Sequence, residues 1–515
     1  MEHNRNTTAL EGASMSPAVP TTRVDVRMYC LGTGDCFVLK FFAQEELQFT
    51  MLIDCGSCMG TRADFLPYIE NLVDYVEGKL DLLVITHEHQ DHVNGFDKCL
   101  EEFEQLEIGE AWFAWTEDPD DPQGRAQDLL QKRQKMRLGL RNAITQLHTN
   151  RGAIHAEQTN LKANEQALLA LDAFLDGMDT LGAVNLDEAL PAAGGLAGMR
   201  KIKQLLKNKQ VRTRYLLPGA SLPMPQVPGV RFHVLGPPLD KAHIFADGKE
   251  GRDTHPRHTT PGEGILAMNS FLTIDGDISP GDLPFSDKYA VGAQGLVQSE
   301  LDHSPAESAV YLSQARDLFD RYAAFDNKWR DIEQEWLYTA GSLAIRLDSH
   351  INNTSLALAI EIGTGGPVLL LPGDAEYANW ESWHLIEKWN GTGPNPKHFV
   401  TDLLSRTVFY KVSHHLSFNG TPLDKGIQLL NNPDLAVMVP LDLRRISSRW
   451  RTTMPNYRLL RDLMERSQGK CIIMDEIEII PRPSAQYDLT TLGEARYRVI
   501  TKDGQTLAKQ YTVFV

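Results

Sequence analysis

The stretch Thr86-His87-Glu88-His89-Gln90-Asp91-His92 gathers three imidazoles and a carboxylate directly after Leu82-Leu83-Val84-Ile85, an apolar run that predicts a buried strand. Imidazole and carboxylate groups together suit zinc, manganese or iron. His87 and His89 are two residues apart, so on an extended segment they point the same way, while Asp91-His92 follows in the loop and can face a second ion. The stretch therefore predicts a metal site, against the alternative of a solvated polar loop.

Two apolar runs in the second half of the chain also end in polar side chains. Val368–Leu371 leads to Asp374, whose carboxylate can bridge two ions, cap the helix that follows, or do both. Val408–Val412 leads to the adjacent His414 and His415, and such a pair fits one metal ligand and one group that supports it or transfers a proton. The alternative, two surface histidines, is disfavoured because the position at a strand end recurs.

The first strands are predicted on either side of a turn rich in glycine. Residues 24–28 alternate apolar and polar side chains, and Leu31-Gly32-Thr33-Gly34-Asp35-Cys36 follows as the turn. No Gly-Lys-Ser/Thr follows the Gly-x-Gly, so a phosphate-binding loop is not indicated. Asp35 is expected near the rim of the metal site, or alternatively as a turn cap. A further strand, Phe49–Ile53, ends at Asp54.

Taken in order, these motifs resemble those of the metallo-β-lactamase fold hydrolases. Within that group they are most similar to the hydrolase domain of the DNA-uptake competence protein ComEC and its soluble, stand-alone relatives. The resemblance implies an α/β fold, namely a four-layer αββα sandwich with metals at one edge of its two sheets. The matched elements are Gly32–Asp35, Ile53-Asp54, His87–His92, Asn353–Leu356, Pro372–Asp374 and Ser413–His415.

The resemblance also implies two divalent metal ions, zinc or manganese. One ion would be bound by His87 and His89, the other by Asp91, His92 and His414, with Asp374 bridging both. The catalytic residues implied are Asp91, His415 and Asp35, with His415 as proton donor to the leaving group. Hydrogen bonds that orient the ligands are expected from Asp54, Asn353 and Ser413.

Two positions depart from the pattern of the family. Many members have a further histidine between the first motif and the bridging aspartate, and this chain has no convincing match to it, as is often the case in ComEC-like members. The glycine that usually follows the paired histidines is Leu416 here.

Such a site supports metal-assisted hydrolysis, because two ions roughly 3.5–4 Å apart lower the pKa of a bridging water and clamp an anionic leaving oxygen. We expect a phosphodiesterase or nuclease whose anionic partner is single-stranded nucleic acid or a nucleotide. Two alternatives stay open: hydrolysis of a lactone, thioester or other carboxylic ester, and non-catalytic binding by a degenerate metal site.

The composition of the 515-residue chain is that of a large globular protein, with 42% hydrophobic and 23% charged residues. The net charge of −17 argues against a generally basic nucleic-acid coat protein but allows a local basic groove. The polar residues 1–23 are predicted to be a disordered lead-in without a secretory signal, and no apolar run is long enough to span a membrane. The six cysteines are therefore expected as thiols in the cytoplasm, without disulfides.

One hydrolase domain, residues 24–515, is predicted to carry two insertions, a mostly helical one at about 117–215 and a mixed one at about 239–340. Within the first insertion, residues 131–151 and 200–214 carry basic side chains and no acidic ones. They are interpreted either as solvated helix faces or as a track for a polyanion. The residues predicted to contact substrate are Lys132, Arg133, Lys201 and Lys203. The C-terminal strands and an Asp503-Gly504 hairpin are expected to complete the second sheet.

Overall fold

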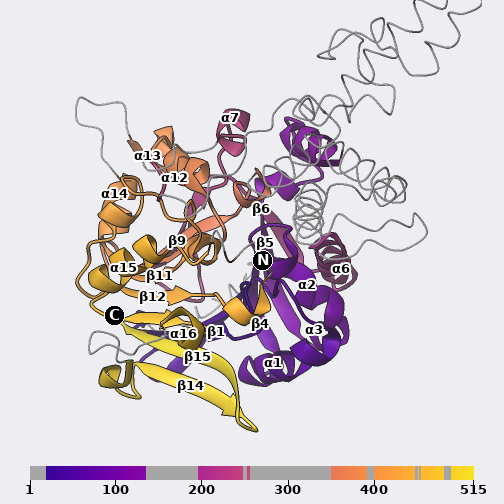
Figure 1. Cartoon of the computed structure of the whole chain (residues 1–515). Coiled ribbons are helices and arrows are strands. Elements are labelled where there is room, and N and C mark those ends of the chain that lie inside the picture. The colour runs from indigo at the N-terminus through magenta and orange to yellow at the C-terminus, as the bar shows by residue number, and fades with distance from the viewer. Residues whose placement is uncertain are drawn as a thin grey trace, which may run out of the picture.

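The computed structural model describes residues 19–134, 195–246, 252–255, 350–390, 399–446, 451, 454–480 and 489–515. This part of the chain is an α/β protein with two mixed sheets of eight and seven strands, consistent with a sandwich-type fold (Figure 1). Most of the predicted lead-in and large parts of both predicted insertions lie outside the described residues, so their boundaries stay predictions.

The first sheet joins the N-terminal half of the chain to its C-terminus. Its strand order is β14-β15-β1-β2-β3-β4-β5-β6. The pairs from β3 to β6 are parallel, and the pairs from β14 to β3 are antiparallel. The strands are β1 (Arg23–Tyr29), β2 (Phe37–Ala43), β3 (Glu46–Ile53), β4 (Lys79–Ile85), β5 (Glu107–Ala114), β6 (Arg212–Leu216), β14 (Tyr497–Lys502) and β15 (Gln505–Phe514).

The second sheet has the order β13-β12-β11-β10-β9-β8-β7. Its pairs from β10 to β13 are parallel and those from β7 to β10 are antiparallel. The strands are β7 (Ser221–Pro223), β8 (Val230–Gly236), β9 (Ala357–Ile362), β10 (Val368–Leu371), β11 (Thr407–Lys411), β12 (Ala436–Val439) and β13 (Cys471–Ile473).

The Asp503-Gly504 hairpin was expected in the second sheet, and this prediction was wrong. Residues of β15 pair antiparallel with β1, and β14 pairs with β15, so the hairpin extends the first sheet. The turn signal determines that two strands pair locally, but it carries no information about which distant strand they join. The prediction was correct for β12 and β13, which lie in the second sheet.

An apolar core lies between the two sheets. It contains side chains of both, such as Phe41 and Trp112 from the first sheet and Phe232 and Leu369 from the second. The rings of Trp112 and Phe232 meet edge to face with centroids 5.3 Å apart. Because side chains alternate along a strand, the opposite face of each sheet is left for helices to cover.

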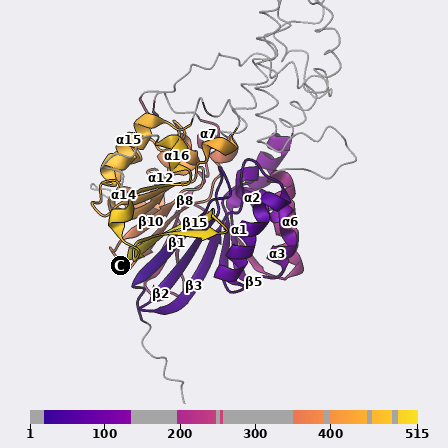
Figure 2. The same cartoon turned by 60° about the horizontal axis from the view of Figure 1, so that its bottom comes forward.

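Separate groups of helices pack on the two sheets (Figures 1 and 2). On the first sheet lie α1 (Arg62–Tyr75), α2 (Gln90–Lys98), α3 (Leu100–Glu104) and α6 (Gly195–Asn208), whose apolar residues share one cluster with its strands. On the second lie α12 (Tyr377–Trp383), α14 (Phe399–Ser405) and α15 (Tyr457–Arg466). The shorter helices described are α7 (Lys241–Ile244), α13 (Glu387–Asn390) and α16 (Glu476–Ile479).

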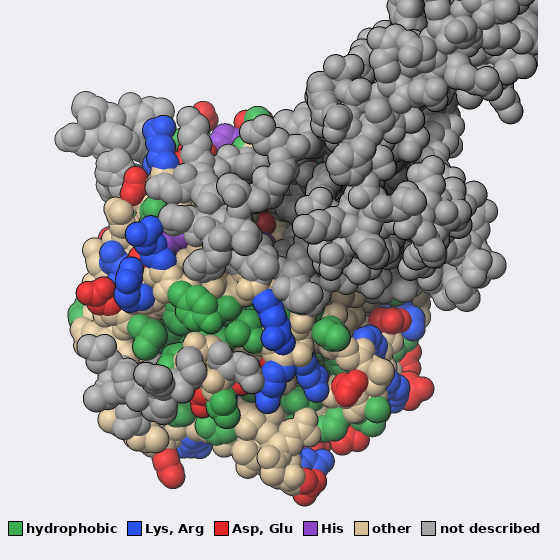
Figure 3. Space-filling model, in the orientation of Figure 1, with side chains coloured by type: hydrophobic (Ala, Val, Ile, Leu, Met, Phe, Trp, Pro, Cys, Tyr) green, Lys and Arg blue, Asp and Glu red, His purple; other side chains and the backbone are tan. Residues whose placement is uncertain are grey.

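The face shown in Figure 3 carries charges of both signs, although the net charge of the chain is −17. On the face shown in Figure 3, basic, acidic and hydrophobic side chains are interspersed. None of the helices that the structure describes combines the length and apolar character needed to cross a membrane. The six cysteines are all described, and none of them forms a disulfide.

Candidate metal centre

The candidate site lies at the edge where strands of both sheets end. The motif Thr86–His92 follows β4, Asp374 follows β10, and His414 and His415 follow β11. Because β3 and β4 are parallel, as are β10 and β11, the polar residues after each pair come out at the same end of their sheet. The predicted strands that became β3, β4, β10 and β11 are therefore confirmed, and their carboxyl ends bring the polar residues that follow them together.

Close backbone contacts fix the start of α2, which carries Asp91 and His92. The amide of Asp35 donates to the carbonyl of Asp91 at 2.9 Å, and the amide of Cys55 donates to the carbonyl of His92 at 2.8 Å. A Cβ atom on Gly56 would lie 2.4 Å from the carbonyl carbon of Asp91, so only glycine allows this approach. The glycine-rich turn thus acts as a support for the metal motif and not as a phosphate loop.

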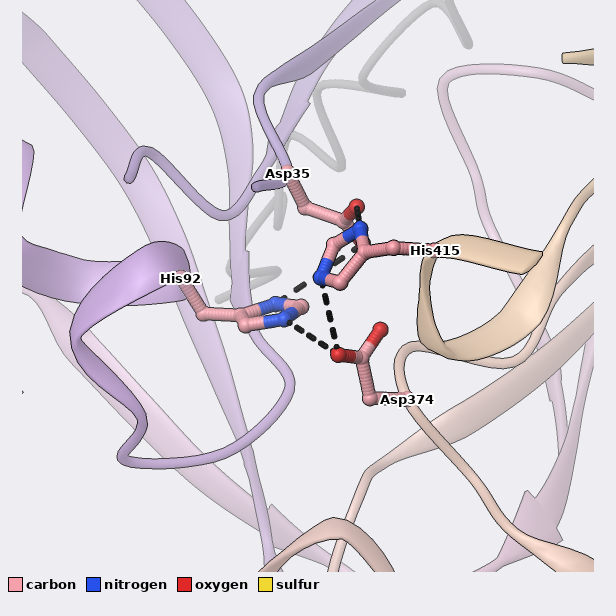
Figure 4. A group of neighbouring side chains, drawn as sticks. All are labelled: Asp35, His92, Asp374 and His415. Atoms are coloured by element: carbon pink, nitrogen blue, oxygen red, sulfur yellow. Dashed lines mark ion pairs between the residues drawn. The ribbon is translucent and has the colours of Figure 1, made fainter. Parts of the chain in front are cut away.

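Four buried side chains converge at this edge: Asp35, His92, Asp374 and His415 (Figure 4). One ligand atom from each lies within 4.8 Å of those of the others. The Nε2 atoms of His92 and His415 each lie 3.0 Å from Oδ2 of Asp374. Asp91 adjoins the group, with its Oδ2 atom 3.1 Å from Nε2 of His415. The cluster could hold a metal ion.

The imidazoles of the cluster are oriented as metal ligands usually are. Nδ1 of His92 lies 2.7 Å from Oδ2 of Asp54, and Nδ1 of His415 lies 2.9 Å from the carbonyl oxygen of Pro440. Each Nδ1–H is therefore directed at an acceptor, and in the neutral ring the lone pair is on Nε2, which faces Asp374. Fixing the tautomer through the second nitrogen is how proteins prepare histidine for a cation.

The pKa values reflect concentrated negative charge. Burial alone would lower the pKa of His92, but the carboxylates of Asp374, Asp35, Asp54 and Asp91 outweigh it and raise that pKa well above its usual value. For His415, burial acts the same way, and Asp374 and Asp91 raise its pKa to about 9. Burial would raise the pKa of Asp374, but His415, Lys411 and His92 hold it well below its usual range. Positive charge is therefore favoured at the centre of the cluster.

The donor set fits a divalent cation. Among the described residues, Oδ1 of Asp35 and Oδ1 of Asp91 are buried and accept no hydrogen bond. Of the three carboxylates Asp35, Asp91 and Asp374, Lys411 pairs with Asp35 and Asp374, and Asp91 pairs with His415. Two protonated imidazoles would balance the remaining charge, and so would one divalent ion with neutral imidazoles. Carboxylate and imidazole are ligands that zinc and manganese accept.

Lys411 was missed by the sequence analysis. Its side chain is buried, and Nζ lies 2.5 Å from Oδ2 of Asp35 and 2.9 Å from Oδ1 of Asp374. Burial would lower the pKa of Lys411, but these two carboxylates raise it above its usual value. The alternation of β11 was a usable signal, because Lys411 is two residues after Phe409, which packs between the sheets, and so lies on the same face.

His87 and His89 lie beside the cluster. Nε2 of His87 is 3.0 Å from Nδ1 of His89, and the rings of His87 and His92 have centroids 4.1 Å apart. Burial lowers the pKa of His87 well below its usual value and that of His89 to about 4. Both rings are therefore neutral at neutral pH, as ligands must be. Ser355 belongs to the matched stretch Asn353–Leu356 but was given no role, and its Oγ lies 3.3 Å from Nδ1 of His87.

His414 and His415 lie in a left-handed turn that directs their side chains to different places. Both residues have φ of 46°, and Leu416 follows with φ of 66°. Residues other than glycine rarely adopt this conformation, so the glycine that the resemblance leads us to expect at position 416 would fit it with less strain than Leu416. The turn sends His415 into the four-residue cluster, while Nδ1 of His414 lies 3.2 Å from Oε1 of Glu376. The role of His414 as a metal ligand stays a prediction.

His414 belongs to the wall of a small pocket above the cluster. Besides members of the site, Asn352 and Cys58 line this pocket. Nδ2 of Asn352 lies 3.3 Å from Nε2 of His414, and Sγ of Cys58 lies 3.6 Å from Oδ2 of Asp91. The C-x-x-C spacing of Cys55 and Cys58 is interpreted as loop packing, with a reaction with metals or oxidants as the alternative. The contacts of Cys58 and Asn352 with the site depend on long-range packing.

The three residues expected to orient the metal ligands, Asp54, Asn353 and Ser413, make different kinds of contact. Asp54 contacts His92, as described, and burial raises its pKa. Ser413 donates from Oγ to the carbonyl of Ala375 at 2.7 Å and so holds the segment that carries Asp374. Oδ1 of Asn353 instead accepts from the amide of Asn379 at 3.3 Å, and its Nδ2 donates to the carbonyl of Ile244 at 3.4 Å.

The four basic residues predicted to contact substrate lie in two environments. Lys132 and Lys201 are exposed. Arg133 is buried and Lys203 is one-third exposed, and both form ion pairs with Glu117. A role of the four in substrate binding stays a prediction, and for Arg133 the position is not an exposed helix face. Residues 135–151 of the first basic segment lie outside the described residues.

Comparison with known proteins gives one partial similarity. The anti-Pycsar protein Apyc1 of Paenibacillus sp. (strain J14) is 34% identical over 77 residues, which cover 14% of this chain and 29% of that protein. No protein-family model matches the chain. No solved structure matches it either. Because the chain spans less than a third of the curated relative, the similarity does not assign a family.

Replacing Lys411 by Met should destabilise the protein strongly. Two buried carboxylates would lose their shared cation, and breaking a buried pair costs about 3–5 kcal/mol. Urea unfolding in metal-free buffer would measure the loss. The matched control is Lys40→Met, because Lys40 is also a buried strand lysine but pairs with the exposed Glu77 at 3.6 Å. There the loss should be smaller, because the exposed carboxylate of Glu77 stays solvated when its partner is removed. Equal losses in the two variants would contradict the assigned role of Lys411.

Proposed function

We propose that this protein is a metal-dependent hydrolase of the metallo-β-lactamase type with two divalent ions, zinc or manganese. The observation that carries the proposal is the buried cluster of Asp35, His92, Asp374 and His415, in which both imidazoles present Nε2 to one carboxylate oxygen. Two sheets with an apolar core between them and helices outside are in keeping with the four-layer αββα sandwich of that family.

In the proposed site, His92, His415 and Asp374 would hold one ion, and the carboxylates of Asp35 and Asp91 adjoin these residues. His87 and His89 would hold the second ion, and Asp374 would be a ligand of both. This assigns the ligand role to His415 in place of His414. When bound, the ions supply Lewis acidity where water attacks the substrate. Asp54 and the carbonyl of Pro440 keep the two imidazoles in the tautomer that leaves Nε2 free of a proton.

His414 is then the candidate for proton transfer to the leaving group. It lines the pocket, and its Nδ1 lies 2.8 Å from Oγ of Ser417 and 3.2 Å from Oε1 of Glu376. A carboxylate next to one ring nitrogen stabilises the imidazolium form that must exist while a proton passes to the substrate. The exchange of roles between His414 and His415 follows from the left-handed turn that carries them.

We propose a phosphodiester as the substrate, in nucleic acid or a nucleotide. The support is the resemblance to ComEC-like hydrolases together with the exposed Lys132 and Lys201. Hydrolysis of a carboxylic ester is the rival, since the same ions can polarise a carbonyl. Non-catalytic binding is the second rival, and Leu416 in place of the usual glycine favours it.

Metal content should depend on two histidine pairs separately. Elemental analysis after dialysis against zinc or manganese should find two ions per chain in the wild type, one in His87→Gln/His89→Gln, and one in His92→Gln/His415→Gln. The control is His243→Gln, on the surface helix α7, which should keep both ions. Equal metal content in the wild type and the His92/His415 variant would sink the proposal, provided that circular dichroism shows both proteins folded.

The wild-type protein should hydrolyse phosphodiesters. The wild type with added manganese or zinc would be assayed on bis-p-nitrophenyl phosphate, single-stranded DNA, RNA, cyclic nucleotides and lactones. We expect hydrolysis of at least one phosphodiester and its loss, by at least about a hundredfold, in His414→Gln if that residue transfers the proton. Turnover of esters alone would reject the phosphodiester assignment, and no turnover of any compound would favour a binding protein.

Reversing the charge of the exposed basic pair should weaken binding of an oligonucleotide. In Lys132→Glu/Lys201→Glu, the slope of log affinity against log salt should become shallower by about 1.4, because each lost phosphate contact on a single strand accounts for about 0.7. The control pair is Lys79→Glu/Lys502→Glu. Both control residues are exposed, and Lys79 begins β4 at the end opposite the motif. An unchanged slope in the first variant would leave these residues as ordinary solvated side chains.

A further inference from the structure

Four charged side chains form a network beside the metal motif, and none of them belongs to the cluster of Figure 4. Nη1 of Arg133 lies 2.7 Å from Oε1 of Glu88, and Nη2 of Arg133 lies 3.3 Å from Oε1 of Glu117. Nζ of Lys203 lies 2.9 Å from Oε2 of Glu117. The network therefore joins the motif loop, the turn after β5, residues of the predicted insertion and helix α6.

Arg133 is the centre of this network. It is 4% exposed, and its two terminal nitrogens reach two different carboxylates. A guanidinium holds its donors in a fixed plane, so binding two carboxylates at once fixes their relative position, which the single ammonium of a lysine does less well. Lys203, by contrast, is one-third exposed and pairs with Glu117.

The helical residues 125–134 that carry Arg133 are held in place independently of it. Asp121 accepts from the amide of Arg125 at 2.7 Å and from the amide of Ala126 at 3.2 Å, which fixes the start of the helix. Ala126 and Leu129 pack with Trp115 and Ile244 in a small apolar cluster. The position of the guanidinium is thus set by the packing of its own helix, so Arg133 can impose a position on Glu88.

Glu88 stands between His87 and His89 in the chain, and all three are buried. The backbone bends at Glu88, and the rings of His87 and His89 meet there, with Nε2 of His87 3.0 Å from Nδ1 of His89. A side chain held at Glu88 therefore fixes the loop that carries both histidines. We propose that Arg133 is a positioning residue that holds the loop of His87 and His89 through Glu88, and so couples the inserted segment to the candidate metal centre. The inference rests on the proposed function only for the statement that these histidines hold an ion.

The test compares Arg133→Gln with Lys203→Gln, because each variant removes one cation from the same network. Amide hydrogen exchange of peptides spanning residues 86–92 would be measured in metal-free protein, together with affinity for zinc or manganese by calorimetry. In Arg133→Gln, we expect exchange to rise at least tenfold and metal affinity to fall by about 10–100-fold, the usual effect of losing a group that orients a ligand. In Lys203→Gln, both quantities should stay within about threefold of the wild type.

A conservative variant keeps the test decisive if Arg133→Gln does not fold. Arg133→Lys retains the positive charge but cannot contact Glu88 and Glu117 at the same time with two nitrogens. Amide exchange at residues 86–92 should therefore rise above that of the wild type, by a smaller factor than in Arg133→Gln. Wild-type exchange in Arg133→Lys, or equal changes in Arg133→Gln and Lys203→Gln, would overturn the proposal. If the wild type binds no divalent ion, the proposed function fails, whereas the exchange comparison still decides the role of Arg133.

Discussion

Three carboxylates are buried together where the strands of both sheets end, and their neutralisation is the constraint on which the site depends. Asp35 follows β1 of the first sheet, Asp374 follows β10 of the second, and the ammonium of Lys411 contacts both. Buried charge without a partner is strongly unfavourable, so the two sheets are held together at this edge by the same groups that can bind a cation. Folding and site assembly therefore use one set of contacts.

The rest of the fold supplies the rigidity that such a cluster needs. An apolar core fixes the distance between the sheets, and helices on the outer faces hold the strands whose ends carry the polar residues. Around the motif loop, support comes from three directions: the backbone of the glycine-rich turn, Asp54 at the end of β3, and Arg133 from the predicted insertion. A site held in this way can keep its geometry with or without an ion.

Much of this arrangement was determined by local sequence. The runs that became β3, β4, β10 and β11 are apolar because strands buried on both faces need such side chains, and polar residues follow each run where the strand leaves the core. Imidazole and carboxylate within one loop after a strand are ligand types that predict a cation site before the tertiary structure is known. These are properties of short segments, so periodicity and residue type were sufficient to predict them.

Only the tertiary structure decided which of these groups meet. His415 and Asp91 are 324 residues apart in the chain, and a left-handed turn, not the order of the two histidines, brings His415 into the cluster. In the sequence, Lys411 looks like an ordinary strand residue, but in the structure its Nζ lies 2.5 Å from Asp35 of the other sheet. Arg133 likewise looks like a surface charge in the sequence, but in the structure it is paired with Glu88 and Glu117. The Asp503-Gly504 hairpin likewise joins the first sheet through β1. Sequence pattern specifies which side chains leave a strand and where, but the pairing of distant charges depends on how the sheets pack.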